Sequence, residues 1–453
     1  MSLVGYDSVM KKIKPIGGSS VMAIIPQMNL FSWEDIEDLG DLRRLKLVIE
    51  YLPDEELMTA LEKQRKNGRN DYPIRAIWNT ILAGIVFEHR SIESLRRELS
   101  RNAQLRHLCG LGFRHVPTSS AYSRFMKNLL QLEDKINDMF YDTVNELKTL
   151  LPDYGKSLAI DSKAIQSFAN HRNKNQNADG RRELDADYGI KSYHGQRKDG
   201  TLWEKIVRWF GYKLHLIVDS AYELPIAYSV TKASVSDVKE AHQLIDTLES
   251  KQPEILEKTE VLSGDKGYDD TKFIEKLWDE YEVKPVIDLR NMWKDKDETR
   301  LFKQYSNVTH DYKGTIYCHC PLTGTEREMV NGGFEKDRNT LKKLCPAVQY
   351  GITCHGASEC SVKQGIRISL HENRRIFTPI DRASYKWKRE YNKRTAVERV
   401  NSRLDVSFGF ENHTIRGLKK MKVRAGLALC VMLAMAVGHI KENRLDKMRS
   451  FVS

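Results

Sequence analysis

The hydrophobic pattern of the chain changes at Pro152, and this change limits the folds that the chain can adopt. Before this residue, apolar side chains recur at helical spacing, most clearly between Tyr72 and Leu108. After it, short apolar runs predict strands, first closely spaced and then alternating with helices. Hairpin strands pair antiparallel and strands joined through helices pair parallel, so we expect a mixed α/β sheet preceded by an all-helical domain. The expected elements are strands at 157–165, 209–219 and 224–231, a helix at 237–248, a strand at 261–262, a helix at 271–281 and a strand at 283–287.

The same pattern divides the chain into four segments. We expect residues 1–150 to form the helical N-terminal domain and residues 151–289 to form the first part of the α/β domain. In residues 290–381, Gly, Cys and charged residues are interleaved, which indicates an insertion. Residues 382–453 contain two further helical patterns and are expected to complete the α/β domain. Residues 174–200 are polar and aperiodic, which predicts a long exposed loop.

The charge balance favours a polyanionic partner. The sequence contains 73 Lys and Arg against 62 Asp and Glu, a net charge of +11. Residues 382–424 alone contain 13 basic and four acidic residues, a local net charge of +9. Such a segment binds phosphate arrays, and its aromatic side chains can stack on unpaired bases, whereas a solvated basic helix over an aromatic core is the alternative. These aromatic residues are Tyr385, Trp387, Tyr391, Phe408 and Phe410.

Hydropathy and cysteine usage indicate a cytoplasmic protein without a membrane partner. The mean hydropathy is −0.54, and the longest apolar run, 425–438, is shorter than the roughly 18–20 residues that a spanning helix needs. The N-terminal residues lack the apolar segment of a secretory signal. Seven cysteines, an odd number, fit a reducing compartment better than a secreted disulfide framework.

Three acidic residues occupy positions where a carboxylate is unexpected. Asp161 lies in an apolar strand, Asp265 follows a strand within a glycine-flanked turn, and Glu398 lies in a strongly basic helix. A carboxylate on a sheet core is costly unless it is paired or bound to a metal. Two carboxylates from adjacent strand ends and a third from a packed helix can hold two Mg²⁺ or Mn²⁺ ions for phosphodiester chemistry. An ordinary salt bridge of Asp161 is the alternative.

These residues resemble the signature of bacterial insertion-sequence DDE transposases. The resemblance rests on Asp161 on an early strand, on the Gly-Asp-Lys-Gly-Tyr turn at 264–268, and on the late helical pattern Tyr391-x2-Arg394-x3-Glu398. It spans residues 72–440, with 290–381 the least similar part. In the helical N-terminal region it rests on Asp71-Tyr72-Pro73-Ile74, Arg96-Arg97-Glu98-Leu99, Leu108-x-Gly110-Leu111 and Pro117-x-Ser119.

The resemblance implies a ribonuclease-H-like catalytic fold with an insertion before the helix that carries Glu398. It implies that Asp161, Asp265 and Glu398 are the catalytic triad and bind two Mg²⁺ or Mn²⁺ ions. The activity would be cleavage of double-stranded DNA at terminal inverted repeats, bound through the helical N-terminal domain, followed by joining of the 3′-OH to target DNA. It further implies a homodimer on DNA, associated with the bacterial nucleoid. A nuclease that does not join strands and a transposase-derived DNA-binding protein are the alternatives.

The resemblance also implies that Tyr391 and Arg394 contact DNA phosphates near the cut. The family pattern often continues with a Lys at the position where this chain has Asp405. The residues that could supply the missing positive charge, and thus also bind DNA, are Arg399, Arg403, Lys419 and Lys420.

Three further features have a structural and a functional interpretation. Five of the seven cysteines fall within 318–360, which is compatible with a zinc site or with reduced thiols in a β-rich insertion. His215 and Asp219 could be additional metal ligands, although a structural histidine and a turn-forming aspartate are favoured. The helix at 416–440 is apolar on nearly every face, which indicates burial in the core or a dimer interface. The five cysteines are Cys318, Cys320, Cys345, Cys354 and Cys360.

Overall fold

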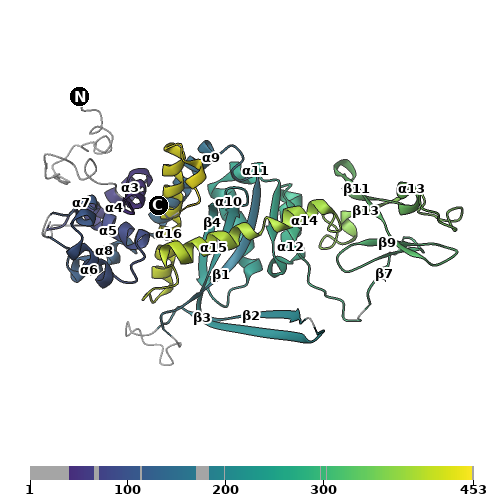
Figure 1. Cartoon of the computed structure of the whole chain (residues 1–453), viewed down its shortest axis with the longest axis horizontal. Coiled ribbons are helices and arrows are strands. Elements are labelled where there is room, and N and C mark those ends of the chain that lie inside the picture. The colour runs from purple at the N-terminus through teal and green to yellow at the C-terminus, as the bar shows by residue number, and fades with distance from the viewer. Residues whose placement is uncertain are drawn as a thin grey trace.

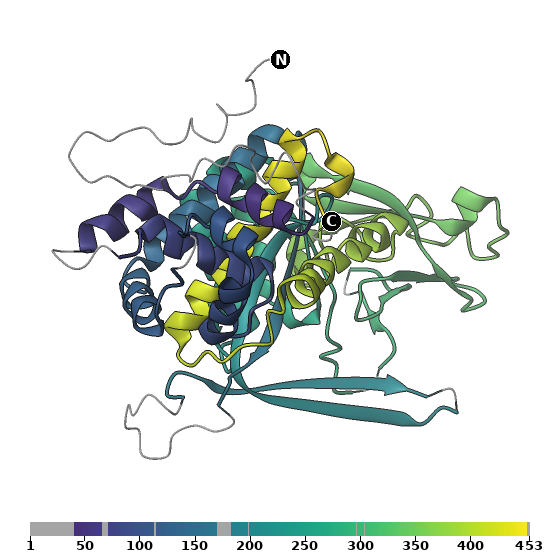
Figure 2. The same ribbon diagram turned by 60° about the vertical axis from the view of Figure 1, so that its left-hand side comes forward.

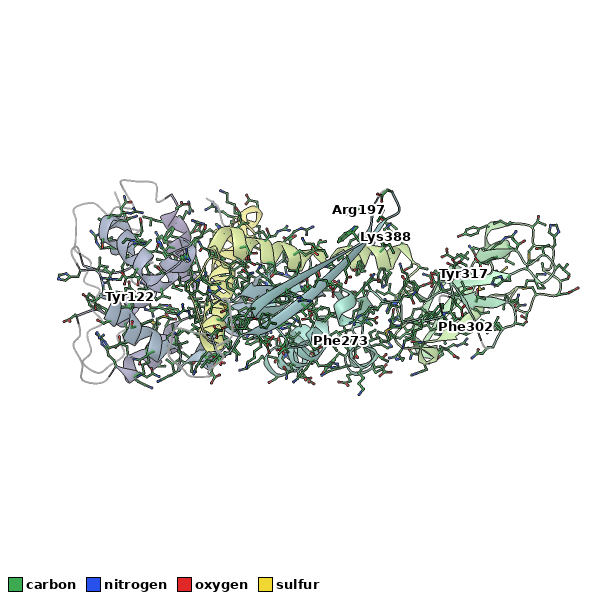
Figure 3. All side chains as sticks on the ribbon, turned by 90° about the horizontal axis from the view of Figure 1, so that it is seen from below. Tyr122, Arg197, Phe273, Phe302, Tyr317 and Lys388 are labelled. Carbon is green, nitrogen blue, oxygen red and sulfur yellow. The ribbon has the colours of Figure 1, made fainter. Side chains whose placement is uncertain are left out.

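The computed structural model describes residues 40–65, 71–112, 115–169, 183–197, 199–295, 297–302 and 304–450. Three parts follow one another along the long axis of the molecule, namely a helical region, a central sheet with its helices, and an outlying β-rich part (Figure 1). Tyr122 and Phe273 belong to one large core that the helical region shares with the sheet, whereas Phe302 belongs to a separate core (Figure 3).

The helical region confirms the periodicity seen before Pro152. Three of its helices begin at side-chain caps, because Ser91, Asn102 and Thr118 accept hydrogen bonds from the amides of Ser94, Leu105 and Ala121. The helices are α3 (Leu42–Tyr51), α4 (Glu55–Gln64), α5 (Ile74–Val86), α6 (Ile92–Arg101), α7 (Ala103–Leu108), α8 (Ser119–Leu129) and α9 (Glu133–Leu150).

The central sheet is mixed, as the sequence predicts. Strand β3 pairs antiparallel with β1, β2 and β4, whereas β1, β5 and β6 run parallel to one another. The strands are β1 (Ser157–Gln166), β2 (Asp187–Gln196), β3 (Leu202–Asp219), β4 (Pro225–Lys232), β5 (Val261–Gly264) and β6 (Lys284–Ile287). The connections to the parallel strands contain α10 (Asp237–Lys251), α11 (Pro253–Lys258), the 3₁₀ turn η1 (Lys266–Tyr268), α12 (Thr271–Glu275) and the π-helical turn η2 (Lys276–Glu280).

The prediction of a loop at 174–200 is wrong for its second half. Residues 187–196 form β2, which pairs with the first half of β3 in a ribbon that projects from the body of the molecule (Figures 1 and 2). A Cβ on Gly189 would lie 2.2 Å from the Trp209 ring, and one on Gly195 would lie 2.5 Å from the Trp203 ring. Cross-strand tryptophans therefore cover the two glycines and compensate for the missing apolar run in β2. Residues 174–182 lie outside the described residues.

Helix α16 (Leu418–Lys441) joins the helical region to the sheet. It packs against α3, α5, α9 and β4. Among the described residues it is the one helix long and apolar enough to cross a membrane, but 89% of its most apolar window is buried inside the protein. The expectation that no segment is long enough to span a membrane was based on the apolar run 425–438 alone. It is wrong for length, because the helix that contains this run has 24 residues. Its all-round apolar pattern is explained by burial in the protein's own core.

The β-rich part has its own hydrophobic core, which includes Leu341, Ile368 and Phe377. One sheet contains β7 (Arg300–Leu301), β8 (Val308–His310), β9 (Ile316–His319) and β10 (Glu326–Glu328). A second contains β11 (Val330–Glu335), β12 (Thr340–Leu344) and β13 (Ile366–Ser369). The short elements are η3 (Lys336–Arg338), α13 (Pro346–Tyr350) and η4 (Leu370–Glu372). The chain then returns to the central sheet in α14 (Tyr385–Asn392) and α15 (Thr395–Phe408), and η5 (Leu445–Lys447) follows α16.

Candidate active site

The register of the parallel strands places three aspartates side by side, each one residue beyond the last paired row of β1, β5 and β6. Ile160 of β1 pairs with Gly264 of β5, and Gly264 pairs in turn with Ile287 of β6. Strands β5 and β6 end at this row, whereas β1 continues to Gln166, so the residues that follow the row lie side by side where β5 and β6 end. These residues are Asp161, Asp265 and Asp288. Asp288 is not among the residues predicted from the sequence, although its position directly after the apolar run of β6 is a usable signal.

Two glycines allow the tight turn that carries Asp265. The carboxylate of Asp265 accepts a hydrogen bond of 2.7 Å from the amide of Gly267 and so caps η1. A Cβ on Gly267 would lie 2.7 Å from Asp265 Oδ1, and a Cβ on Gly264 would lie 3.2 Å from Ile160 Cγ2. Each glycine therefore leaves room for the carboxylate or for the neighbouring strand.

The surroundings of Asp161 disfavour the charged form of its carboxyl group. Burial raises the pKa of Asp161 from its ordinary value of 3.8 to about 6, and the negative charge of Asp265 adds to this rise. The charges of Lys191 and Arg394 and a 2.7 Å hydrogen bond from the Ser162 amide oppose it without cancelling it. The site is therefore short of positive charge, which is the condition that a bound cation relieves.

Glu398 is linked to this site through Arg394. Helix α15 packs against β1 and β3, and Glu398 lies in its first turn. The Arg394 guanidinium donates to Glu398 Oε1 at 2.8 Å, and the charge of Arg394 also lowers the pKa of Asp161. The Glu398 side chain is 52% exposed. Arg394 thus acts on two of the three predicted metal-binding carboxylates, Glu398 and Asp161.

Four of the five aromatic residues of the basic segment pack against the protein's own hydrophobic residues. Trp387 and Tyr391 stack on each other, with ring centroids 4.8 Å apart and planes at 10°, over a small cluster that includes Val261 and Val286. Phe408 and Phe410 are buried. The prediction that Phe408 and Phe410 stack on bases is therefore wrong, because these rings complete the core. Tyr385 is exposed.

Two of the predicted DNA-binding arginines form ion pairs with a carboxylate of the same chain. Arg399 donates to Glu223 Oε1 at 2.7 Å, and Arg403 lies 3.5 Å from Glu223 Oε2. Glu223 lies between β3 and β4, so these arginines fix α15 to the sheet. Lys419 and Lys420, by contrast, are exposed at the start of α16.

Lys191 is a cation that sequence analysis missed. Its Nζ donates to the carbonyl oxygen of Ser162 at 3.1 Å, directly beside Asp161. Among the described residues, Lys191 has no carboxylate partner within ion-pair distance. It lies on β2, within the segment expected to be a loop, so the sequence offered no sign that it reaches the site.

His215 and Asp219 have the structural roles that were favoured. His215 is buried, its Nε2 lies 2.9 Å from Thr231 Oγ1, and burial lowers its pKa to about 4. Asp219 accepts hydrogen bonds from the amides of Gly155, Ala221 and Tyr222, at 2.8, 2.8 and 2.6 Å. Asp219 therefore organises the turn after β3.

The five clustered cysteines are free thiols that approach one another. Burial, with the neighbouring thiols of Cys345, Cys360 and Cys354, raises the pKa of Cys318 to about 11. Hydrogen bonds from Thr323 lower the pKa of Cys320 to about 6. In the part of the chain that the structure describes, no group of three or more His, Cys, Asp or Glu side chains has the spacing to hold a metal ion. The zinc site stays a prediction.

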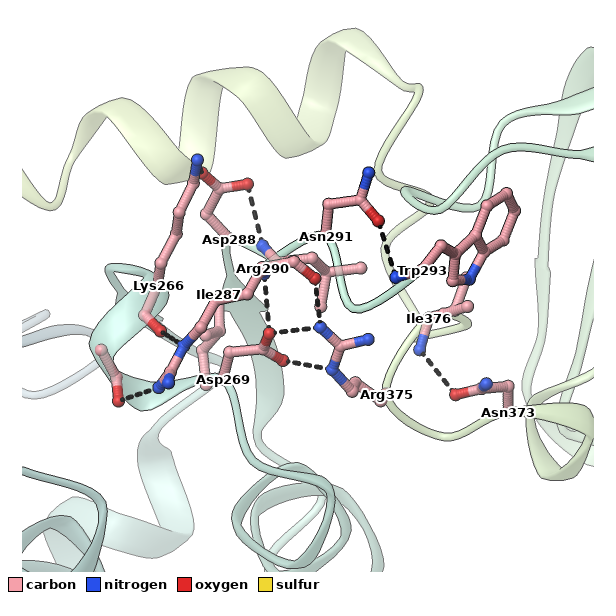
Figure 4. A network of polar contacts seen from close by, with 12 residues as sticks. Lys266, Asp269, Ile287, Asp288, Arg290, Asn291, Trp293, Asn373, Arg375 and Ile376 are labelled. Carbon is pink, nitrogen blue, oxygen red and sulfur yellow. Dashed lines mark hydrogen bonds and ion pairs between the residues drawn. The ribbon is translucent and has the colours of Figure 1, made fainter. Parts of the chain in front are cut away.

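A network of ion pairs surrounds the turn after Asp265 (Figure 4). The carboxylate of Asp269 is 1% exposed and accepts two hydrogen bonds from the Arg375 guanidinium, at 2.8 and 2.5 Å. Arg290 donates to the carbonyl oxygens of Lys266 and Gly267, at 2.7 and 3.0 Å. Neither arginine was singled out from the sequence, because nothing in the local pattern links them to the turn.

Comparison with known proteins gives two family matches. Residues 157–434 match the family described as "Transposase DDE domain", and residues 31–128 match "Transposase domain (DUF772)". No curated protein matches the chain. The cryo-EM structure of the piggyBac transposase synaptic complex with hairpin DNA matches at 12% sequence identity and a TM-score of 0.30, over 92% of this chain and 86% of that chain. A TM-score of this size does not by itself indicate a shared fold.

Proposed function

The chain belongs to the family of transposase DDE domains, and from this premise we propose that it is the DNA transposase of a bacterial insertion sequence. It binds the terminal inverted repeats, cleaves DNA at the element ends and joins the 3′-OH to target DNA. The observation that carries the proposal is the register of β1 and β5, with Asp161 and Asp265 each one residue beyond the pair Ile160–Gly264. Glu398 contributes the third carboxylate from α15, across Arg394.

The proposed architecture is a ribonuclease-H-like catalytic domain that is interrupted by an insertion. The strand order β4-β3-β1-β5-β6, antiparallel on one side of β1 and parallel on the other, supports this fold. The separate hydrophobic core of the β-rich part supports an insertion at 290–381. We accordingly propose an N-terminal DNA-end-binding domain at 1–150 and catalytic segments at 151–289 and 382–453.

Asp161, Asp265 and Glu398 are proposed to hold Mg²⁺ or Mn²⁺, with two ions per active site. Carboxylate oxygens are the hard ligands that these ions prefer. The raised pKa of Asp161 supports the fit, because a cation would relieve the repulsion between Asp161 and Asp265. When bound, the metal would activate the attacking water or hydroxyl and stabilise the leaving oxygen. Glu398 reaches the site when its ion pair with Arg394 opens.

Basic side chains around the acids are proposed to bind the DNA backbone. Lys191 and Arg394 flank Asp161 and are suited to the phosphate next to the cut. Arg197 at the tip of the β2–β3 ribbon and Lys388 on α14 are both exposed (Figure 3). Together with Lys419 and Lys420, these residues would contact the phosphates along the duplex, and such contacts do not depend on the base sequence.

The reaction requires two element ends to be joined in concert, so we propose a homodimer on DNA. Cleavage of a single end would leave a broken chromosome. Burial of α16 in the core means that the interface has to lie elsewhere. Light scattering of the protein with and without end-containing DNA tests the dimer. A complex that keeps one protein per end and still completes concerted joining would refute it.

A strand-transfer assay tests the proposed function. The full chain is incubated with DNA that carries the candidate inverted repeats, a supercoiled target plasmid and Mg²⁺. We expect cleavage at the repeats and joined products that disappear when the repeats are scrambled. Cleavage without joined products would identify a nuclease, and binding without cleavage would identify a DNA-binding protein derived from a transposase.

A further inference from the structure

The turn that carries Asp265 is held by residues from both ends of the β-rich insertion. Arg290 lies just after β6, where the chain leaves the central sheet, and Arg375 lies just before the chain returns to it. The two arginines also contact each other, because Arg375 Nη2 donates to the carbonyl oxygen of Arg290 at 2.5 Å. They therefore form a single clamp that closes the base of the insertion (Figure 4).

The contacts of this clamp are concentrated on the residues next to Asp265. The side chain of Arg290 donates to the carbonyl oxygens of Lys266 and Gly267, the two residues that directly follow Asp265. Its backbone amide donates to Asp269 Oδ2 at 2.8 Å. The same carboxylate receives the bidentate contact from Arg375. The turn is thus fixed at 266, 267 and 269 by one clamp.

Contacts of two further residues, Lys266 and Arg382, fix the clamp to the sheet. Lys266 Nζ lies 3.5 Å from Asp288 Oδ2, which connects the turn to the strand end beside it. Arg382, which is half-buried, donates to the carbonyl oxygens of Ile376 and Arg375, at 3.1 and 2.9 Å, and to that of Ile287. The position of Asp265 therefore depends on the insertion as well as on β5.

If the clamp served only to hold the insertion to the sheet, its contacts would not need to be concentrated on the residues next to Asp265. An ion pair anywhere between the insertion and the sheet would be sufficient. Four of the hydrogen bonds described above instead end on Lys266, Gly267 or Asp269 from guanidinium groups. A planar guanidinium that makes several bonds fixes both distance and orientation. We infer that Arg375 and Arg290 are positioning residues that hold the carboxylate of Asp265 for metal binding, so that the insertion and the active site are mechanically coupled. The inference rests on the proposed function of Asp265.

The test compares Mg²⁺ binding of the full chain with and without the clamp. The variants are Arg375→Gln, Arg375→Lys and Arg290→Gln. The control is Arg367→Gln, because Arg367 belongs to the same insertion and makes a similar ion pair, with Glu335 at 2.7 Å, away from the turn. Mg²⁺ affinity is measured by calorimetry, the Mg²⁺ concentration for half-maximal cleavage is measured on DNA ends, and thermal unfolding is followed without metal.

Loss of the clamp is expected to weaken Mg²⁺ binding and to raise the Mg²⁺ requirement of cleavage by about 10- to 100-fold, as for other residues that orient metal ligands. Arg375→Lys, which keeps the charge but loses the fork, should show the same shift while retaining the unfolding midpoint. Arg367→Gln should leave both Mg²⁺ measurements unchanged. A folded Arg375→Lys protein with wild-type Mg²⁺ affinity would overturn the inference. If wild-type protein itself neither binds Mg²⁺ nor cleaves DNA, the proposed function fails instead.

Discussion

Lys163 on β1 and Asp405 on α15 form an ion pair of 2.6 Å across the face of the sheet. Lys163 also donates to Glu411 at 2.7 Å, so two carboxylates neutralise its charge. A lysine at position 405 would face Lys163 and be repelled by it. The acidic residue at 405 is thus explained by its neighbour on β1, and the positive charge beside Asp161 has to come from another residue.

Lys191 is the residue that we expect to supply this charge. Its Nζ lies beside Asp161 and has a carbonyl partner, so it can turn to a phosphate oxygen at little cost. Lys191→Met is expected to lower the single-turnover cleavage rate by roughly 100-fold, the effect of removing one preorganised donor. The matched control is Lys205→Met, an exposed lysine on the same ribbon. Equal single-turnover cleavage rates for the two variants would show that Lys191 does not contribute to cleavage.

The raised pKa of Asp161 makes stability depend on pH. Because the folded protein holds the proton of this acid up to a pKa of about 6, against 3.8 ordinarily, ionisation destabilises the fold as pH rises through this window. Asp161→Asn should therefore be more stable than wild type at pH 7.5 without metal, by on the order of 2 kcal/mol. The difference should vanish below pH 4. Denaturant unfolding at several pH values measures it, and a difference that does not change with pH would contradict this assignment.

Gly267→Ala should displace the carboxylate of Asp265. The added Cβ would lie 2.7 Å from Asp265 Oδ1, so this flexible side chain has to move. Since a displaced ligand binds its metal less well, we expect roughly tenfold weaker Mg²⁺ binding, measured by calorimetry. Gly112→Ala is the control, because its nearest contact is 3.8 Å away. Unchanged Mg²⁺ affinity of the Gly267→Ala protein would show that the turn tolerates the methyl group.

Zinc in the insertion is a separate prediction. The thiols around Cys318 raise its pKa by mutual repulsion, in addition to burial, and a bound Zn²⁺ would remove this repulsion as the thiols close around it. We expect about one zinc per chain by elemental analysis, and a lower unfolding midpoint after chelation. The prediction would be contradicted if the purified protein contained no zinc and if Cys318→Ser and Cys345→Ser left its stability unchanged.

The sequence predicts those parts of the fold that have strong local patterns. Strands β1, β4 and β6 and the second half of β3 contain apolar runs, and α16 has an apolar stretch, so their positions follow from periodicity. Strand β2 has no such run, because tryptophans of β3 supply its packing. A strand that depends on its partner in this way cannot be recognised from its own residues.

The candidate site shows the same division between local and tertiary information. Asp161 and Asp265 stand out because a carboxylate inside or directly after an apolar strand is costly unless it is paired or bound to a metal. The roles of Arg399 and Arg403 could not be predicted, because Glu223, some 180 residues earlier, binds both. The clamp of Arg290 and Arg375 depends likewise on Asp269, which is 106 residues from Arg375. The sequence does not show which acid each basic residue contacts, because these partners are brought together only by the fold.

The central claim is that Asp161, Asp265 and Glu398 bind metal for catalysis while basic residues bind DNA. The most direct measurement is single-turnover cleavage of an end-containing DNA in Mg²⁺, together with DNA affinity, for Asp161→Ala, Asp265→Ala and Glu398→Ala. Each variant is expected to lose detectable cleavage and to bind the DNA with an affinity within about threefold of wild type, because the carboxylates make no attractive phosphate contact. A variant that cleaves at the wild-type rate would contradict the assignment of that residue to the triad.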